Sequence, residues 1–149
     1  MIEIKRLAEY DEKLAADMGR LLKDLDAAAT GAPISREWME EVIESRWHDQ
    51  LLAYDGEDLV GMATVSVVMS AFGGRVEYLE DLVVSKERQG QGIGSVLWEA
   101  IVAWGREKGA KKLEFTSSGK DLKAGAVEFY LGKGAEIRET NNFRFKLGE

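Results

Sequence analysis

The stretch Glu87-Arg88-Gln89-Gly90-Gln91-Gly92-Ile93-Gly94-Ser95 places three glycines at alternate positions of a 149-residue chain. It follows an apolar run and precedes an amphipathic pattern, although glycine is disfavoured inside both strands and helices. A strand, a glycine turn and a helix start together favour anion binding, because the first helical turn has free N–H groups and partial positive charge. The stretch therefore predicts a phosphate-binding turn, and a tight turn with left-handed backbone is the structural alternative.

Two familiar nucleotide-binding patterns do not fit this turn. A P-loop ends in Gly-Lys followed by Ser or Thr, and Gly94-Ser95-Val96 has no lysine. A dinucleotide fingerprint needs a third glycine, and the two possible reading frames place Ser95 or Leu97 there. The turn also follows at least three expected strands, whereas a dinucleotide fold opens with its glycine turn. The phosphate ligand must therefore be of another kind.

The pattern of apolar residues on either side of the turn predicts an alternation of strands and helices. Helical spacing is expected over 14–25, after an N-cap at Ser35, from Ile93 to Trp104, and over 124–131. Strands are expected at 2–7, 50–54, 59–70, 75–84, 112–116, 135–139 and 143–147. No linker or internal repeat interrupts the chain, so residues 1–149 are predicted to form one α/β domain with a mixed sheet.

The strand before the turn ends in the uninterrupted apolar run Leu82-Val83-Val84. Such a run implies burial on both faces, which favours the centre of a sheet. Glu80 and Asp81 precede it and should face opposite sides of a regular strand, although a bulge would change that assignment.

The composition excludes several classes of function. The net charge of −7 does not suit a nucleic-acid binder, which usually carries a basic patch; it could attract a cationic substrate or simply keep the protein soluble. The absence of cysteine excludes disulfides, zinc–thiolate sites and thiol nucleophiles. Neither a secretory h-region nor a bilayer-spanning run is present in the sequence, so a cytoplasmic protein is expected.

The run from Gln89 to Gly94 matches the pattern Gln/Arg-x-x-Gly-x-Gly/Ala, and here the chain resembles the GNAT superfamily of N-acetyltransferases. The wider frame, residues 82–94, departs from the usual family pattern at Lys86, where proline is common. A second family motif fits residues 123–135, with Ala126, the pair Phe129-Tyr130 and Gly134 in place. Lys123 replaces the usual asparagine and Ala135 the usual phenylalanine.

The resemblance implies the GNAT fold, a mixed and mostly antiparallel sheet of six to seven strands flanked by about four helices. It implies acetyl-CoA as co-substrate and no metal. The pantetheine arm would pair with the strand end and the pyrophosphate would bind at the turn. The implied cofactor-binding residues are Leu82, Val83, Val84, Gln89, Gly90, Gln91, Gly92, Ile93, Gly94 and Ser95.

Transfer of an acetyl group to an amine needs a proton acceptor for the amine and a proton donor for the leaving thiolate. The second motif makes Tyr130 the general-acid candidate, since a phenol stays protonated near neutral pH; its structural alternative is a core aromatic. Glu80 is the first candidate for the base. Asp81, a water chain and the single histidine, His48, are the alternatives.

The expected acceptor is a primary amine, most simply a small molecule. Acidic residues in 24–47 could attract it or form a solvated helix face. A protein N-terminus or lysine side chain is the alternative acceptor. A non-catalytic acyl-CoA sensor is the alternative of a different class. Family resemblance suggests a possible homodimer, and no nucleic-acid or membrane partner is expected.

Overall fold

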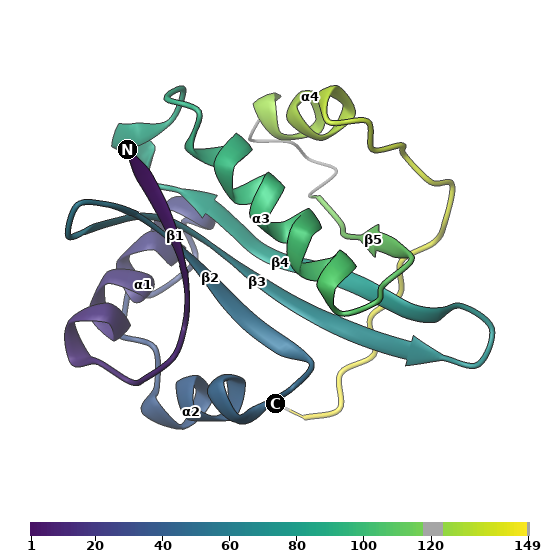
Figure 1. Ribbon diagram of the computed structural model, residues 1–149, viewed down its shortest axis with the longest axis horizontal. Coiled ribbons are helices and arrows are strands. Elements are labelled where there is room, and N and C mark those ends of the chain that lie inside the picture. The colour runs from purple at the N-terminus through teal and green to yellow at the C-terminus, as the bar shows by residue number, and fades with distance from the viewer. Residues whose placement is uncertain (118–123, 149) are drawn as a thin grey trace. The chain divides into compact units, whose positions relative to one another are not determined.

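The computed structural model describes residues 1–117 and 124–148 (Figure 1). The chain divides into two compact units, Met1–Phe115 and Thr116–Glu149. The first unit contains β1 (Ile2–Arg6), α1 (Glu12–Leu25), α2 (Arg36–Glu44), β2 (His48–Asp55), β3 (Asp58–Ser70), β4 (Gly74–Val84), a 3₁₀ turn at Lys86–Arg88, α3 (Ile93–Glu107) and β5 (Lys112–Glu114). The second contains α4 (Ala124–Gly132).

One sheet with the order β1-β2-β3-β4-β5 forms the centre of the first unit. Strands β1, β2, β3 and β4 pair with one another antiparallel in that order, and β5 runs parallel to β4. The pairing of β5 with β4 is short and covers only Val76–Tyr78 of β4. This arrangement confirms the predicted α/β class with a mixed, mostly antiparallel sheet.

The expected number of six to seven strands is wrong for the described residues, which form five strands and four α-helices. The missing pair is the one expected at 135–139 and 143–147, where residues 135–148 contain no strand. The pattern at 143–147 is strand-like, because apolar residues alternate there with basic ones. The three apolar side chains, Phe143, Phe145 and Leu147, are nevertheless exposed. Alternation shows that a segment suits a strand, but a strand also needs a hydrogen-bonded neighbour.

The helices of the first unit cover the two faces of its sheet. Met18 and Leu21 of α1 and Met39 of α2 pack with Met62 and Val83 in one buried cluster. On the opposite face α3 runs diagonally across the strands (Figure 1), and Ile93 and Leu97 approach the Cα of Gly61 closely enough that a side chain there would crowd them. The core therefore lies in two layers, with β3 and β4 between them.

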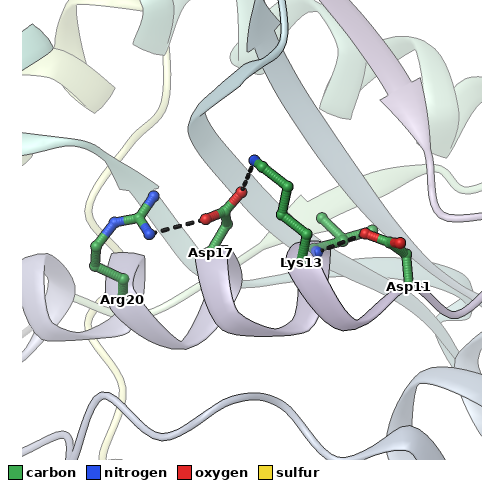
Figure 2. Close-up of polar contacts among 5 residues, drawn as sticks. Asp11, Lys13, Asp17 and Arg20 are labelled. Atoms are coloured by element: carbon green, nitrogen blue, oxygen red, sulfur yellow. Dashed lines mark hydrogen bonds and ion pairs between the residues drawn. The ribbon is translucent and has the colours of Figure 1, made fainter.

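Local sequence signals place the ends of these helices. Ser35 caps α2, as predicted, by accepting a hydrogen bond from the backbone N–H of Trp38. Asp11 caps α1 in the same way through Leu14 (Figure 2). Helix α3 ends at Glu107, and Gly109 takes the left-handed φ of +79° just beyond it, as the sequence predicts for a stop.

Candidate active site

The glycine turn joins the end of β4 to the start of α3. Gly90 and Gly92 have φ values of +81° and +83°, and Gly92 is the N-cap residue of α3. Among the described residues, nothing lies within 4 Å of a Cβ placed on either glycine. Backbone conformation therefore explains these two glycines, as the structural alternative requires, and the same geometry leaves space above the peptide backbone.

That space fits a phosphate group. Gly92 brings no side chain to the N-terminus of α3, a 15-residue helix whose first N–H groups and dipole favour an anion. Gly94 lies in the first turn of α3, so the third glycine also adds no side chain at this end of the helix. The turn thus combines an exposed backbone, a helix start and open space, which are features that favour an anionic ligand.

Side chains tie the turn to the rest of the first unit. Gln89 donates from Nε2 to the backbone carbonyl of Val84 at 3.2 Å. Arg88 donates from Nη2 to Asp55 Oδ2 at 2.6 Å and from Nε to Gln91 Oε1 at 2.9 Å. The backbone N–H of Lys86, where family members usually have proline, donates to Asp24 Oδ2 at 3.1 Å. The turn is therefore held although it contains two left-handed glycines.

The second edge of β4 is open beside the turn. β5 pairs with Val76–Tyr78 only, so residues 79–84 have no second neighbour strand among the described residues. Val83 is buried, whereas Leu82 and Val84 are half-buried. The expected burial of this run at the sheet centre is therefore only partly correct, because β4 is an interior strand whose final residues lie at an edge. Backbone groups at such an edge can pair with an extended ligand.

A β-bulge in β4 decides where the two candidate bases point. Thr64 pairs with Glu80 and Met62 with Val83, so Asp81 and Leu82 together oppose a single residue of β3. Asp81 takes the left-handed φ of +51°, which aspartate tolerates better than most residues. As a result Glu80 shares a face with Val83, the face that α1 and α2 cover further along, and the simple alternation expected from the sequence does not apply.

A polar row crosses this face of the sheet beside the bulge. Gln50, Thr64 and Glu80 pair in register across β2, β3 and β4. Gln50 is 1% exposed, and its Oε1 accepts a 2.7 Å hydrogen bond from the Thr64 hydroxyl. Burial raises the pKa of the Asp81 carboxyl, while a hydrogen bond with Thr64 opposes the rise. The side chains of Glu80 and Asp81 are both exposed to solvent, which limits the effect of burial on the Asp81 carboxyl.

Tyr130 lies in α4, in the second compact unit. Its ring makes an edge-to-face contact with Phe129, with centroids 5.4 Å apart. Burial raises the pKa of its phenol above the ordinary value of 10, which keeps the proton on the side chain near neutral pH. Its catalytic role stays a prediction. Lys123, the departure from the second family motif, lies outside the described residues.

Sequence reasoning did not identify Gln50, Thr64 or the contact between Arg88 and Asp55. Gln50 could have been noticed, since it is the polar residue at an inward position of a strand that continues with Leu51 and Leu52. Thr64 and Arg88 could not have been noticed in this way. Their partners, Gln50 and Asp55, lie far from them in the sequence, so no local pattern indicates these contacts.

A separate surface hollow of about 400 Å³ lies beside α1 and contains none of the predicted site residues. Two of the charged side chains around it, Lys13 and Asp17, form an ion pair. Asp17 accepts hydrogen bonds from Lys13 and Arg20, both at 2.8 Å (Figure 2). Burial would raise the pKa of Asp17, but these two cations outweigh it and lower the value. The network therefore ties three charged side chains of α1 to one another.

No cluster of three or more metal-ligating side chains occurs among residues 1–117 and 124–148. In the same described part of the chain, no helix is both long and apolar enough to cross a membrane.

Comparison with known proteins identifies relatives over nearly the whole chain. The model of the acetyltransferase (GNAT) family matches residues 20–133. Thialysine N-epsilon-acetyltransferase of Sus scrofa is 30% identical over 148 residues, which cover 96% of this chain and 82% of the relative. The enzyme of the same name from Bos taurus is 30% identical over 134 residues, covering 89% and 74%.

Solved structures show the same fold. An aminoglycoside acetyltransferase from an uncultured soil metagenomic sample, in complex with sisomicin, superposes with a TM-score of 0.84 at 22% identity, covering 99% of this chain and 97% of the other. An aminoglycoside N-acetyltransferase in complex with CoA gives a TM-score of 0.79 at 19% identity, covering 99% and 96%. The chain belongs to the GNAT family of acetyltransferases, and it is an acetyl-CoA-dependent N-acetyltransferase.

Proposed function

We propose that the protein transfers the acetyl group of acetyl-CoA to the primary amine of a small, cationic molecule. The observation that carries this proposal is the open edge of β4 at residues 79–84, which leads directly into the glycine turn at the start of α3. An extended pantetheine arm would pair with that edge while its pyrophosphate meets the turn. The curated relatives of similar length are named for acetylation of thialysine, a small amine, which supports the same class of acceptor.

The acceptor side of the reaction would use the polar row beside the bulge. Glu80 and Asp81 lie next to the open edge, so a positively charged amine would be attracted to the place where it must react. One of the two carboxylates would take a proton from the amine before its nitrogen attacks the thioester carbonyl. Asp81 lies at the bulge and forms a hydrogen bond with Thr64 of the polar row, which is a specific reason to test it beside Glu80.

The leaving-group side of the reaction would use Tyr130. A backbone N–H of β4 would hold the carbonyl oxygen as charge develops on it. The carbon–sulfur bond then breaks, and the phenol of Tyr130 would give its proton to the thiolate. Because burial raises the pKa of this phenol, the donor is fully protonated at neutral pH.

A free-thiol release assay with acetyl-CoA and a panel of amines tests the proposal. We expect turnover with small polycationic or diamine acceptors, and slower turnover with peptides that have a free N-terminus or lysine. Tyr130→Phe should reduce kcat about 100-fold while leaving the affinity for acetyl-CoA unchanged. Glu80→Gln and Asp81→Asn, measured in parallel, identify the base by the larger loss in kcat.

Glu99→Gln is the matched control, because it removes an exposed carboxylate of α3 outside the proposed site. Faster turnover of peptides than of every small amine would replace the small-molecule acceptor with a protein acceptor. Binding of acetyl-CoA with no thiol release from any amine would support the sensor alternative instead.

A further inference from the structure

We propose that Arg88 and Asp55 form a clamp that holds the glycine turn in its acetyl-CoA-binding conformation, so that Arg88 acts as a positioning residue and does not bind phosphate. The inference rests on the proposed use of the turn as the pyrophosphate site. Asp55 is the last residue of β2 and Arg88 is the last residue of the 3₁₀ turn after β4. The two are 33 residues apart in sequence.

The sheet brings these two turns to the same end. Gly61 of β3 pairs with Val84 of β4, and the backbone N–H of Ser85 donates to the carbonyl of Val60 at 2.8 Å. The connection between β2 and β3 therefore lies beside the segment that follows β4. This placement lets the Arg88 side chain reach Asp55 directly.

The Arg88 guanidinium connects the end of β2 to the glycine turn. One N–H group binds Asp55 at 2.6 Å and another binds the Gln91 side chain at 2.9 Å. The hydrogen bond from Arg88 and the charge of Arg88 lower the pKa of Asp55, so the carboxylate stays ionised. The Met1 ammonium lies 3.9 Å from the other Asp55 oxygen, but its fully exposed position makes that contact weak.

The clamp acts on the part of the turn whose backbone is least restricted. Gln91 lies between Gly90 and Gly92, the two residues with left-handed backbone. Glycine loses more conformational freedom on ordering than any other residue, so binding a ligand at this turn is costly unless the turn is already ordered. A clamp that orders Gln91 beforehand removes part of that cost and raises the affinity for the ligand.

An alternative is that Arg88 leaves Asp55 and binds a phosphate directly. The two roles predict opposite effects of Asp55→Asn. A clamp needs Asp55, so its loss weakens acetyl-CoA binding. If Arg88 binds phosphate directly, Asp55 competes with the phosphate for the guanidinium. Loss of the Asp55 carboxylate would then leave acetyl-CoA binding unchanged or make it tighter.

The test is a double-mutant cycle of Arg88→Gln and Asp55→Asn, with the dissociation constant of acetyl-CoA measured by calorimetry. We expect Asp55→Asn to weaken binding about fivefold and Arg88→Gln at least as much, because it also removes the contact with Gln91. The double variant should be no weaker than Arg88→Gln, since the contact with Asp55 is then already lost. The KM for acetyl-CoA should rise while kcat stays unchanged. Arg36→Gln is the matched control, because Arg36 forms a 2.7 Å pair with Glu40 on the exposed surface of α2.

Amide hydrogen exchange of residues 86–92 in the ligand-free protein provides a readout that is independent of CoA. We expect faster exchange there in both single variants and wild-type rates in Arg36→Gln. Unchanged exchange, additive losses, or an unchanged or tighter dissociation constant in Asp55→Asn would overturn the clamp. If the wild-type protein binds no acetyl-CoA, the proposed function fails, and the exchange rates alone then decide whether the clamp exists.

Discussion

Glu77 of β4 is a buried carboxylic acid outside the proposed site. Only 2% of its surface is exposed, and its Oε1 has no hydrogen-bond partner among the described residues. It faces Gly105 of α3, where a Cβ would overlap its carboxyl group. Burial raises the pKa of Glu77 to about 8, because water no longer stabilises the charged form. The folded protein therefore keeps a proton on this side chain at neutral pH.

This proton makes the stability of the protein depend on pH. Between the ordinary pKa of 4.5 and about 8, the folded state holds a proton that the unfolded state has lost. The free energy of unfolding should therefore fall as pH rises, by about 1.4 kcal/mol per pH unit for this one group. Glu77→Gln cannot ionise, so we expect urea unfolding between pH 5 and pH 7 to show a flatter profile than the wild type.

The control for that experiment is Glu99→Gln, which removes an exposed carboxylate from α3 and should follow the wild-type profile. Parallel profiles for Glu77→Gln and the wild type would mean that Glu77 is ionised in the folded protein.

Single residues were predictable where the signal is local. Ser35 as a helix cap and Gly109 as a helix stop need only their neighbours in the chain. The left-handed backbone of Asp81 was not predictable, because the bulge depends on how β3 and β4 pair. The same reason applies to Arg88, whose partner Asp55 is placed by the sheet.

At the scale of elements, the strand, the glycine turn and the helix were predictable because each carries a strong pattern. The open edge of β4 was not, since it depends on where β5 stops pairing. The strands expected after residue 134 did not form in the described chain, because their alternating pattern cannot specify a partner. Patterns thus predicted the elements well and the neighbours of each element poorly.

The turn yields its own prediction. Gly92→Glu should abolish the thermal stabilisation that acetyl-CoA gives, because the new side chain fills the space above the turn and repels phosphate. A residue other than glycine at φ +83° also costs about 1–2 kcal/mol of stability. The measurement is thermal unfolding with and without acetyl-CoA.

Gly74→Glu is a close control for this strain and charge. Gly74 has φ +68°, has nothing within 4 Å of its would-be Cβ among the described residues, and lies at the start of β4, at the opposite end of the strand from the turn. We expect this variant to lose similar basal stability and to keep its response to acetyl-CoA. An equal loss of response in both variants would argue against the turn as the phosphate site.

At the scale of the whole molecule, the family match extends over parts of both compact units. Residues 20–133 include the glycine turn of the first unit and Tyr130 of the second. The net charge of −7 agrees with a cationic acceptor and a site that draws it in. A homodimer stays a prediction, as does a single domain over residues 1–149.

The central claim is that the turn after β4 binds the pyrophosphate of acetyl-CoA. The most direct measurement compares thermal unfolding of the wild-type protein with acetyl-CoA and with S-acetylpantetheine, which carries the thioester but lacks the pyrophosphate and the adenosine 3′-phosphate attached to it; adenosine 3′,5′-bisphosphate, which lacks the pyrophosphate bridge, is the matched control for the nucleoside part. We predict that acetyl-CoA at 100 times its dissociation constant raises the free energy of unfolding by about 2.7 kcal/mol, and that S-acetylpantetheine at the same concentration has little effect. Equal stabilisation by the two compounds, or none by millimolar acetyl-CoA, would contradict the claim.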